Sequence, residues 1–428
     1  MQRKVIVIGG GFAGLTAAVY LAKNNYKVTL LEASPKIGGR AYSFLNKETN
    51  TVLDNGQHIL LGCYFETLNF LSIIKATENF HFQKRLEVNF VQEGFRALPL
   101  KSLPFIYPLN LLLDVLRYGA INFLERLTLI KVFLKLPFYS SNRLSRMNIK
   151  EWLENENQSK NVQDSFWKIL AVGALNTSLE KASARVFVHI LRQIFFAGKE
   201  AATIILPRYG LSESYCKNVE KFLQTNGGEV VLSEAVNKLI LKDEKVTEVN
   251  TSNKVYSDFD YVITAVPAFA LSRILDEKYQ LNIPNFTYST ILNIHLWLKE
   301  NSFPEGFFGL INSTMHWVFN KGTHLNLVIS DAGELVNKKD EEIMNMIKDE
   351  MNKFFLLAPD SIINYKIIKE KRATFVPSNN IIDKRPAQQT NIKNLILAGD
   401  WVDTGLPSTI ESAVKSGRVA ADLILNMN

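Results

Sequence analysis

The stretch that decides the fold is KVIVIGGGFAGLTAAVYLAKNNYKVTLLEAS, Lys4 to Ser34. Its apolar run from Val5 to Ile8 predicts a buried strand, which a cluster of glycines ends. Residues Ala13 to Lys23 have the apolar spacing of a helix, and Lys27 to Leu31 predict a second strand that ends at Glu32. This order of strand, glycine turn, helix and strand is typical of a βαβ unit with parallel strands.

The glycines of the turn have the spacing G-x-G-x-x-G of a dinucleotide-binding loop. Gly9 permits the tight turn, Gly11 lets the backbone approach a pyrophosphate, and Gly14 lets the helix pack closely on the strand. The helix N-terminus then favours the negatively charged phosphates. Glu32 follows Gly14 by 18 residues and is placed to accept hydrogen bonds from ribose hydroxyls, which disfavours NADP. The other nucleotide contacts predicted here are Ala13 and Ala33.

The composition limits the class of protein. The 428 residues are enough for two or three domains, and 47% hydrophobic against 21% charged residues indicates a globular protein. Cys63, Cys216 and six scattered histidines form no ligand pattern, so we expect no metal site and a reducing, cytoplasmic compartment. We expect no signal peptide, because a strand begins by Lys4, and no membrane span, because no apolar run reaches ~18 residues.

Six residues after Glu32 comes Gly38-Gly39-Arg40. The pattern E-x5-G-G-R resembles the flavoprotein superfamily of amine oxidases, phytoene desaturases and protoporphyrinogen oxidases. The resemblance implies that the cofactor is FAD and that Gly39 and Arg40 reach its pyrophosphate, a contact that suits the planar guanidinium group.

The C-terminal stretch NLILAGDWVDTGLPSTIESAVKSGRVAADLILN resembles the second half of the same signature. It predicts a buried strand from Leu395 to Ala398 and a long helix from about Ser408 or Thr409. In the superfamily this helix begins under the flavin pyrimidine ring, where the positive end of its dipole stabilises negative charge. The FAD contacts that the resemblance implies in the second half of the chain are Val236 at the adenine, Gly399, Asp400, Thr409 and Ile410.

The stretch VLDNGQHILLGCY interrupts an apolar, strand-like run with Gly56, Gln57 and His58. In the superfamily an extended segment with Asp-x-Gly passes the isoalloxazine ring, and Gly56 matches its glycine, because a side chain would collide with the ring. The resemblance places Gln57 beside the flavin and makes Gln57 and His58 the candidate catalytic residues. His58 is either a proton donor or an anchor for a substrate hydroxyl; the alternative is a core histidine with its hydrogen bonds satisfied.

The strings LDNGQHILLGCY and AGDWVDTGLPSTIESAVKSGR resemble the hydroxysqualene dehydroxylases, a squalene-associated FAD-dependent family. The segment HWVFNK, His316 to Lys321, resembles the Trp-x-Phe segment of that family or is strand core. Amine oxidases hold a lysine near flavin N5 and an aromatic cage, where this chain has Asn293 and Leu406, and this difference fits a hydrocarbon substrate better than an amine.

That resemblance implies an enzyme that reductively removes a hydroxyl from a long isoprenoid, with hydride from reduced flavin. Two alternatives remain open. One is an oxidising carotenoid desaturase of the phytoene type, and the other is a prenyl-binding escort protein of the same fold without catalysis. The electron donor stays unidentified, because the sequence has no second dinucleotide fingerprint.

The middle of the chain is apolar and basic. The stretch SLPFIYPLNLLLDVLRYGAINFLERLTLIKVFLKLPFY predicts two amphipathic helices separated near Tyr118-Gly119. Between Lys101 and Lys150 there are eight Lys or Arg and two acids, which suits a lipid surface better than nucleic acid. We therefore expect peripheral association with the inner face of the cytoplasmic membrane, or else a lobe that packs its own core. Farther on, Asn176-Thr177 with Glu180 predicts a helix start.

Together these features predict an α/β protein of the amine oxidase and phytoene desaturase type. A discontinuous, Rossmann-like FAD-binding domain comprises residues 1–65, 205–268 and 372–428. A discontinuous substrate domain comprises a helical, membrane-facing lobe at 66–204 and a mixed sheet at 269–371. The run from Phe259 to Leu271 is predicted as a buried strand that returns to the FAD-binding domain.

Overall fold

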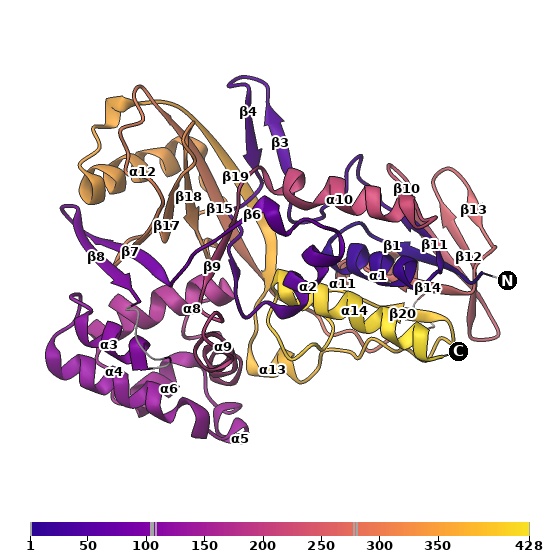
Figure 1. Ribbon diagram of the computed structural model, residues 1–428, viewed down its shortest axis with the longest axis horizontal. Helices are drawn as coiled ribbons and strands as arrows, with labels where there is room; N and C mark the ends of the chain where they lie inside the picture. Colours follow the sequence, from indigo (N-terminus) through magenta and orange to yellow (C-terminus); the bar gives the residue numbers. More distant parts are fainter. Residues whose placement is uncertain (1, 103–106, 108, 277–278, 280, 428) are drawn as a thin grey trace.

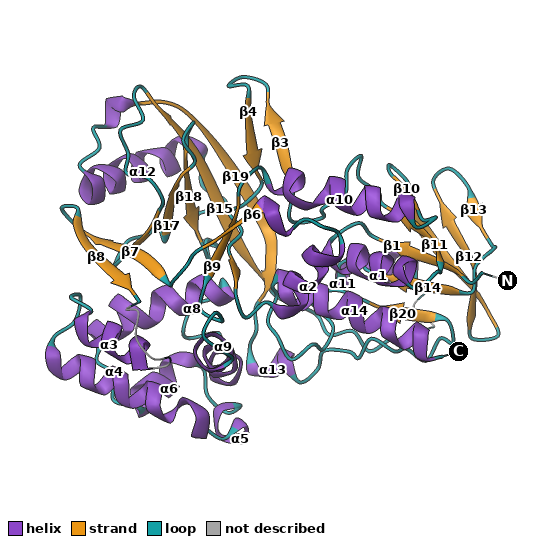
Figure 2. Cartoon of the chain, viewed as in Figure 1, coloured by secondary structure: helices purple, strands orange, loops and turns teal. Residues whose placement is uncertain are grey.

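The structure is a computed structural model that describes residues 2–102, 107, 109–276, 279 and 281–427. A parallel sheet with its helices lies at one end of the molecule, together with both chain termini (Figure 1). A larger sheet and a lobe of helices make up the other end, and Figure 2 shows that the helices of this lobe lie beside one edge of the larger sheet.

The parallel sheet has five strands in the order β10-β2-β1-β14-β20, and every neighbouring pair is parallel. The predicted βαβ unit is confirmed within one residue at each boundary. The strands are β1 (Lys4–Ile8), β2 (Lys27–Leu31), β10 (Glu229–Val231), β14 (Tyr261–Thr264) and β20 (Leu395–Leu397). The helices of this part are α1 (Phe12–Lys23), α2 (Phe65–Ile73), α10 (Leu211–Thr225) and α14 (Ile410–Asn426).

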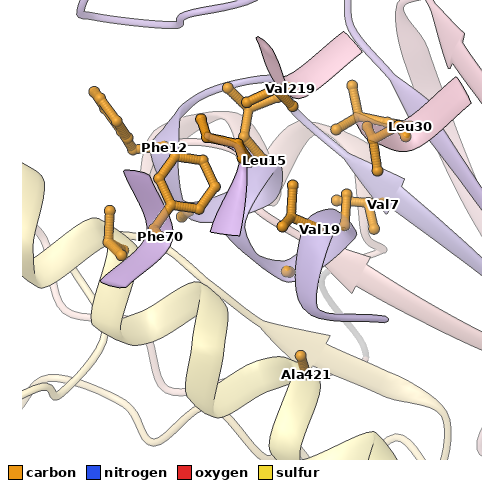
Figure 3. Close-up of a cluster of buried hydrophobic side chains, with 14 of the residues drawn as sticks. Val7, Phe12, Leu15, Val19, Leu30, Phe70, Val219 and Ala421 are labelled. Atoms are coloured by element: carbon orange, nitrogen blue, oxygen red, sulfur yellow. The ribbon is translucent and has the colours of Figure 1, made fainter. Parts of the chain in front are cut away.

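One side of this sheet packs against helices to form an apolar core (Figure 3). Phe12 of α1 stacks on Tyr215 of α10 with ring centroids 4.4 Å apart, and Phe70 of α2 meets the same phenylalanine edge-on. Val219 from α10 and Ala421 from α14 belong to this core too. Segments from three distant parts of the sequence are therefore held by one core.

The predicted strand from Phe259 to Leu271 is only partly correct. The strand β14 ends at Thr264, and Pro267 then precedes a helix, α11 (Ala268–Ile274). Proline lacks the N–H group that a central strand needs, and its fixed φ suits a helix start.

The larger sheet has seven strands in the order β19-β15-β18-β17-β16-β7-β8, and only the β16–β7 pair is parallel. The helix α12 (Asp340–Phe355), between β18 and β19 in the chain, covers one face of this sheet. The strands are β7 (Glu87–Gln92), β8 (Arg96–Lys101), β15 (Tyr288–Leu298), β16 (Phe307–Leu310), β17 (Trp317–Asn320), β18 (Leu325–Ile329) and β19 (Ile362–Phe375).

The helical lobe begins with the two predicted helices, α3 (Leu109–Arg117) and α4 (Phe123–Lys135), separated at Tyr118-Gly119. Residues 103–106 and 108, at the start of the stretch quoted for them, lie outside the described residues. The lobe continues with α5 (Ser141–Leu144), α6 (Ile149–Asn155), α7 (Lys160–Val162), a π-helical turn (Gln163–Trp167), α8 (Lys168–Leu175) and α9 (Ala184–Phe196). Within the described part of the chain, no helix combines the length and the apolar run needed to cross a bilayer.

The prediction of a helix start at Asn176 is wrong. Asn176 ends α8 in the left-handed region at φ 49°, which asparagine tolerates better than most residues, and the next helix begins at Ala184. The Asn176 side chain is held by distant partners, since its Nδ2 donates to Thr374 Oγ1 at 3.0 Å and its Oδ1 accepts from Asp331 N at 2.7 Å. These long-range bonds override the local capping pattern.

Three shorter sheets complete the fold of the described residues, and one of them, β11-β12-β13, lies at the end that holds the chain termini. The β3-β4 hairpin leads into Gly56, and β9 lies between β5 and β6. The bounds are β3 (Ser43–Asn46), β4 (Thr51–Asp54), β5 (Leu60–Leu61), β6 (Phe80–Phe82), β9 (Ile204–Pro207), β11 (Val236–Lys242), β12 (Lys245–Thr251), β13 (Val255–Tyr256) and α13 (Asn379–Ile382).

Candidate functional site

A cavity of about 600 Å³ lies between the carboxyl ends of the parallel strands, the seven-stranded sheet and α8. The residues predicted from the sequence to contact cofactor or substrate line it, except Gly14 and Leu406. We divide its lining into two parts, called the cofactor half and the substrate half, which the following residues define. The cofactor half includes Gly9, Gly11, Ala13, Glu32, Ala33, Gly39, Arg40, Val236, Gly399, Asp400, Thr409 and Ile410. The substrate half includes Gly56, Gln57, His58, Ile59, Gly173, Asn176, Ile291, Asn293, Trp317, Phe319 and Val328.

The glycine loop brings backbone close to the cavity. Gly9 has φ +105°, which side chains rarely adopt. Gly14 lies behind the lining, where a Cβ atom would come within 1.9 Å of Gly9 O, so its role is the close packing of α1 on the loop. Gly11 is the N-cap of α1 and supplies no side chain to it, so the first N–H groups of this helix face the cavity.

Glu32 at the end of β2 is oriented by two backbone donors. Its Oε2 accepts from Gly10 N at 2.6 Å and its Oε1 from Ser34 N at 2.8 Å. A carboxylate has further acceptor positions beyond these two bonds, and Glu32 is only half-buried. The geometry therefore leaves room for ribose hydroxyls, as the sequence predicts.

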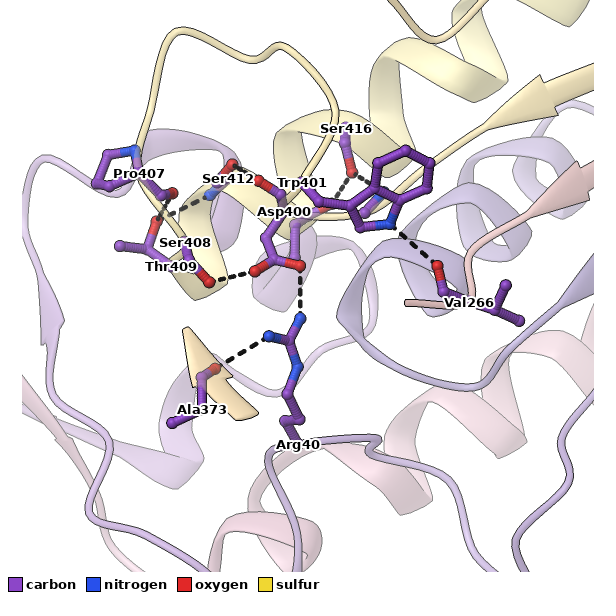
Figure 4. A network of polar contacts seen from close by, with 12 residues as sticks. Arg40, Val266, Ala373, Asp400, Trp401, Pro407, Ser408, Thr409, Ser412 and Ser416 are labelled. Atoms are coloured by element: carbon purple, nitrogen blue, oxygen red, sulfur yellow. Dashed lines mark hydrogen bonds and ion pairs between the residues drawn. The ribbon is translucent and has the colours of Figure 1, made fainter. Parts of the chain in front are cut away.

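Arg40 and Asp400 join the two ends of the chain (Figure 4). Arg40 Nη2 lies 2.5 Å from Asp400 Oδ1, and Arg40 Nη1 donates to Ala373 O at 3.0 Å. Burial would raise the pKa of Asp400, but Arg40 and the Ser408 hydroxyl outweigh it and hold that pKa below its ordinary value. Asp400 is 6% exposed, whereas 41% of the Arg40 side chain stays open toward the cavity and can reach an anion.

The N-terminus of α14 also points at this half. Thr409 is the N-cap, with its Oγ1 accepting from Ser412 N at 3.1 Å, and Thr409 and Ile410 both line the cavity. These features fit FAD, because two helix N-termini, one guanidinium group and one carboxylate with free acceptor positions meet along one cavity. The residues predicted to hold it are those of the cofactor half, together with Gly14 behind the lining and Gly56 and Gln57 where the substrate half begins.

The segment after β4 separates cofactor half from substrate half. A Cβ atom at Gly56 would lie 3.2 Å from Asn293 Nδ2, so only glycine fits here without displacing the amide. Asn293, on β15, is 1% exposed, and its Oδ1 accepts from Gln57 N at 3.3 Å. The position expected for a lysine in amine oxidases thus holds an amide that supports the Gly56-Gln57 backbone.

Two buried polar atoms of this segment have no hydrogen-bond partner among the described residues. They are Gln57 Oε1 and His58 Nε2. Burial lowers the pKa of His58 to about 4, with Asp54 opposing the shift and Lys321 and Arg40 adding to it. The imidazole is therefore neutral near pH 7, which favours the hydroxyl-anchoring role over that of a proton donor.

The rest of the substrate half is largely apolar. Trp317 and Phe319 alternate along β17 and so present the same face, and Gly173 of α8 lies against the indole, with its Cβ position 3.5 Å from Trp317 Nε1. The expectation for Leu406 is wrong, because this side chain is buried outside the lining, where its carbonyl accepts from Arg385 Nη1 at 2.7 Å. Aromatic residues of β17 supply the wall instead.

Sequence reasoning missed the contributions of α8 and β19. Asn176 and Gly173 line the cavity from α8, and Glu370 and Thr374 line it from β19. Their positions depend on how distant strands and helices pack, so no local pattern marks them. Among the described residues, no group of three His, Cys, Asp or Glu side chains is arranged to hold a metal ion.

Comparisons with known proteins agree with this geometry. The chain is 28% identical over 426 residues to a hydroxysqualene dehydroxylase from Zymomonas mobilis, covering 98% of each chain. It is 22% identical over 462 residues to a 15-cis-phytoene desaturase from an Oncidium hybrid cultivar, covering 99% of this chain and 78% of the relative.

A solved oxidoreductase from Methanosarcina mazei shares the fold with a TM-score of 0.74 and 16% identity, covering 98% of this chain and all of that one. The model of the flavin containing amine oxidoreductase family matches residues 12–425. The chain therefore belongs to the flavin-containing amine oxidoreductase family and is an FAD-dependent oxidoreductase.

Proposed function

We propose that this enzyme removes the hydroxyl group of a long isoprenoid alcohol by reduction, with hydroxysqualene as the substrate and squalene as the product. The names of relatives over the full chain support this reaction, and one observation carries it. Gln57 Oε1 and His58 Nε2 belong to consecutive residues, and both atoms are buried and unpartnered in the described structure, at the edge of an apolar chamber.

An alcohol satisfies both atoms, because its O–H can donate to Gln57 Oε1 while its oxygen accepts from His58 Nε2–H. A hydrocarbon leaves both atoms buried without partners, at a cost of about 1–3 kcal/mol each. The pair therefore discriminates between an isoprenoid alcohol and a carotenoid hydrocarbon such as phytoene, although the chain also resembles phytoene desaturases.

The chemistry divides between cofactor and protein. Bound FAD, in its reduced form, supplies the hydride. Gln57 and His58 hold the hydroxyl and so fix the carbon that bears it, while Trp317 and Phe319 hold the apolar chain. The apolar wall keeps bulk water from the reacting carbon.

The helical lobe offers a surface through which such a substrate can enter from a membrane. Phe123, Leu124, Leu127 and Leu134 of α4 are 61%, 73%, 44% and 57% exposed. With 3.6 residues per turn they fall within an arc of about 100° on one face of the helix. Phe138, just beyond, is 84% exposed.

The cations of this lobe serve two purposes. Arg126 donates to Leu116 O at 2.8 Å and Lys135 pairs with buried Glu156 at 2.6 Å, so both stabilise the lobe itself. Lys131 stays exposed beside the apolar face and is free to meet anionic headgroups. Moving about thirty carbons through water would cost on the order of 20 kcal/mol, so direct entry from the bilayer is favoured.

The reaction is tested with enzyme whose flavin has been reduced by one equivalent of dithionite under anaerobic conditions. Adding hydroxysqualene should restore the oxidised flavin spectrum and yield squalene. Gln57→Leu and His58→Phe should retain FAD and react at least about tenfold more slowly, equivalent to ~1.4 kcal/mol. If oxidised enzyme instead dehydrogenates phytoene, and hydroxysqualene leaves the reduced spectrum unchanged, the proposal is wrong.

The membrane contact is tested by flotation with vesicles of anionic phospholipid. The double substitution Leu124→Ser, Leu127→Ser should lower the bound fraction severalfold. Ile363→Ser is the matched control, because this residue is 60% exposed on β19 of the seven-stranded sheet. Equal loss of binding in both variants would show that α4 is not the contact.

A further inference from the structure

A second cavity, of about 380 Å³, adjoins the substrate half of the first. Gln57 and Phe319 line both cavities, so these two side chains form the boundary between them. The second cavity has a different character, because its lining includes Asp54, Lys321, His295, His324 and Asn326.

An ion pair stands in this cavity. Lys321 Nζ lies 3.8 Å from Asp54 Oδ2, and the aspartate is 9% exposed. The other oxygen, Asp54 Oδ1, accepts from Ser43 Oγ at 2.7 Å and from Leu211 N at 2.8 Å, so the carboxylate is fixed in place. Lys321 thus has a fixed partner on one side and the cavity on the other.

The cavity also contains polar atoms that the described residues leave without partners. Asn326 is 1% exposed, and neither its Nδ2 nor its Oδ1 has a partner. His295 Nε2 contacts Asp54 O at 3.2 Å, but its Nδ1 has none. Buried polar groups of this kind hold water, and a space of this size has room for several molecules.

The proposed dehydroxylation needs such a compartment. It consumes a proton and releases water inside a largely apolar chamber, where neither a free proton nor an unpaired polar group is stable. Neutral His58 has no proton to spare near pH 7. The described residues lining the first cavity include no lysine.

We propose that the second cavity is a water-filled compartment that supplies the proton for the departing hydroxyl and receives the water formed, with Lys321 as the residue that holds this proton. The inference rests on the proposed function. Lys321 acts through water past Gln57, so it positions the proton, whereas Gln57 and His58 contact the substrate hydroxyl directly.

The C–O bond breaks and its electron pair stays on oxygen, which keeps its own hydrogen, takes one proton from the Lys321 ammonium group through water, and leaves as water. The new C–H bond takes the hydride that bound, reduced FAD supplies. The Lys321 amine then takes a proton from solvent.

The charges around Lys321 make this exchange possible. Burial lowers the pKa of Lys321, while Asp54 opposes the shift. His295, His324 and Arg208 face the same cavity, and His58 and Arg40 lie beyond the Gln57 boundary. An ammonium group with a lowered pKa gives up a proton more readily than an ordinary lysine.

The first test replaces the amine and supplies it again. Lys321→Ala should retain FAD but re-oxidise with hydroxysqualene at least tenfold more slowly, and added methylammonium should restore much of the rate. The wild-type rate should fall as pH rises through the Lys321 pKa, and this limb should be lost in the variant. Lys299→Ala is the matched control, because Lys299 and Asp360 form a pair at a similar 3.9 Å on the exposed surface.

The second test does not depend on turnover. Reductive methylation with ¹³C-formaldehyde should reveal, by NMR, a Lys321 signal that titrates below ordinary lysine and lower still in Asp54→Asn. If wild-type enzyme reacts and Lys321→Ala keeps the same rate and pH profile, the proton role is wrong while the proposed function stands. If wild-type enzyme ignores hydroxysqualene, the proposed function fails and this inference with it.

Discussion

The two halves of the large cavity are built in different ways. The cofactor half is formed mainly by backbone groups and one ion pair. These are the glycine loop, two helix N-termini and Arg40–Asp400. In the substrate half, side chains define the space, with Trp317 and Phe319 as a wall and Gln57 and His58 at the boundary.

This difference separates binding of the cofactor from choice of the substrate. A backbone-lined site depends on the exact path of the chain and tolerates few changes there, whereas a wall of side chains can be altered residue by residue. Substitutions in the cofactor half should therefore remove the flavin. Substitutions in the substrate half should leave the flavin in place and change what reacts with it.

The largest effect is expected at Gly14. In Gly14→Val the Cβ atom would meet Gly9 O at 1.9 Å, so α1 must move away from the loop. We expect a loss of stability above about 4 kcal/mol and no flavin-bound protein. Gly333→Val is the control, since a Cβ atom there meets nothing within 4 Å. Flavin absorbance and the melting temperature test this expectation. A yellow, stable Gly14→Val protein would contradict the close packing of α1 on the glycine loop.

Acid should disturb His58 and the histidines of the seven-stranded sheet before it disturbs the cofactor half. Burial is the main cause that lowers the pKa of His58, His316 and His324 to about 4 and of His295 to about 3. Unfolded histidines take up protons below about 6.5, whereas these folded ones stay neutral, so stability should fall as pH drops from 6.5 to 4. The loss should reach several kcal/mol in total, measured by urea unfolding at successive pH values.

The cofactor half should respond at lower pH. The pKa of Asp400 is lowered, so its contribution is present above the ordinary aspartate value near ~3.9 and is lost only as pH falls through its folded pKa. His324→Gln should flatten the acid limb between pH 6.5 and 4, and His81→Gln, at an exposed position, should not. If the flavin were released at a higher pH than that at which the unfolding free energy begins to fall, the predicted order would be wrong.

A double-mutant cycle measures the contact between the chain ends. Asp400→Asn leaves Arg40 without its ion pair and should weaken FAD binding about tenfold to a hundredfold, or ~1.4–2.8 kcal/mol. Arg40→Met should weaken FAD binding by a similar factor. The double variant should lose less binding free energy than the sum of the two single losses, with a coupling energy of about 1–2 kcal/mol. Quenching of flavin fluorescence on binding gives the dissociation constants, and additive losses would mean that the two groups bind FAD independently.

The smallest effect is expected at Trp317. In Trp317→Leu the wall beside Gly173 is thinned, and substrate should bind about tenfold more weakly, or ~1.4 kcal/mol. The flavin content should not change, because Trp317 belongs to the substrate half. Anaerobic titration of the reduced enzyme measures substrate binding, and absorbance measures the flavin content. Loss of flavin in this variant would contradict the claim that substitutions in the substrate half leave the flavin in place.

The same division governs what the sequence could predict. The spacing of Gly9, Gly11 and Gly14 lies within one turn and one helix, so local patterns predict β1, α1 and β2 within a residue. Arg40 and Asp400 were each predicted as cofactor contacts, but their mutual ion pair depends on two segments that are 360 residues apart.

Packing between distant elements decides the substrate half. Gly173 of α8 meets Trp317 of β17 because the helical lobe and the seven-stranded sheet pack together in one core. Asn176 shows how such contacts override a local signal, since its bonds to Thr374 and Asp331 turn a predicted helix start into a helix end. Short-range periodicity holds no information about these partners.

The pairing of Arg40 with Asp400 has a consequence for biosynthesis. A nascent chain that has not yet emerged past β20 lacks the last strand of the parallel sheet, the acidic partner of Arg40 and all of α14. The first βαβ unit can fold early. Until β20 and Asp400 are made, the parallel sheet has an unpaired edge and the Arg40 guanidinium group lacks its ion-pair partner. Loading of the flavin is thereby postponed until translation is nearly finished, and a ribosome stalled before Leu395 should carry a colourless chain.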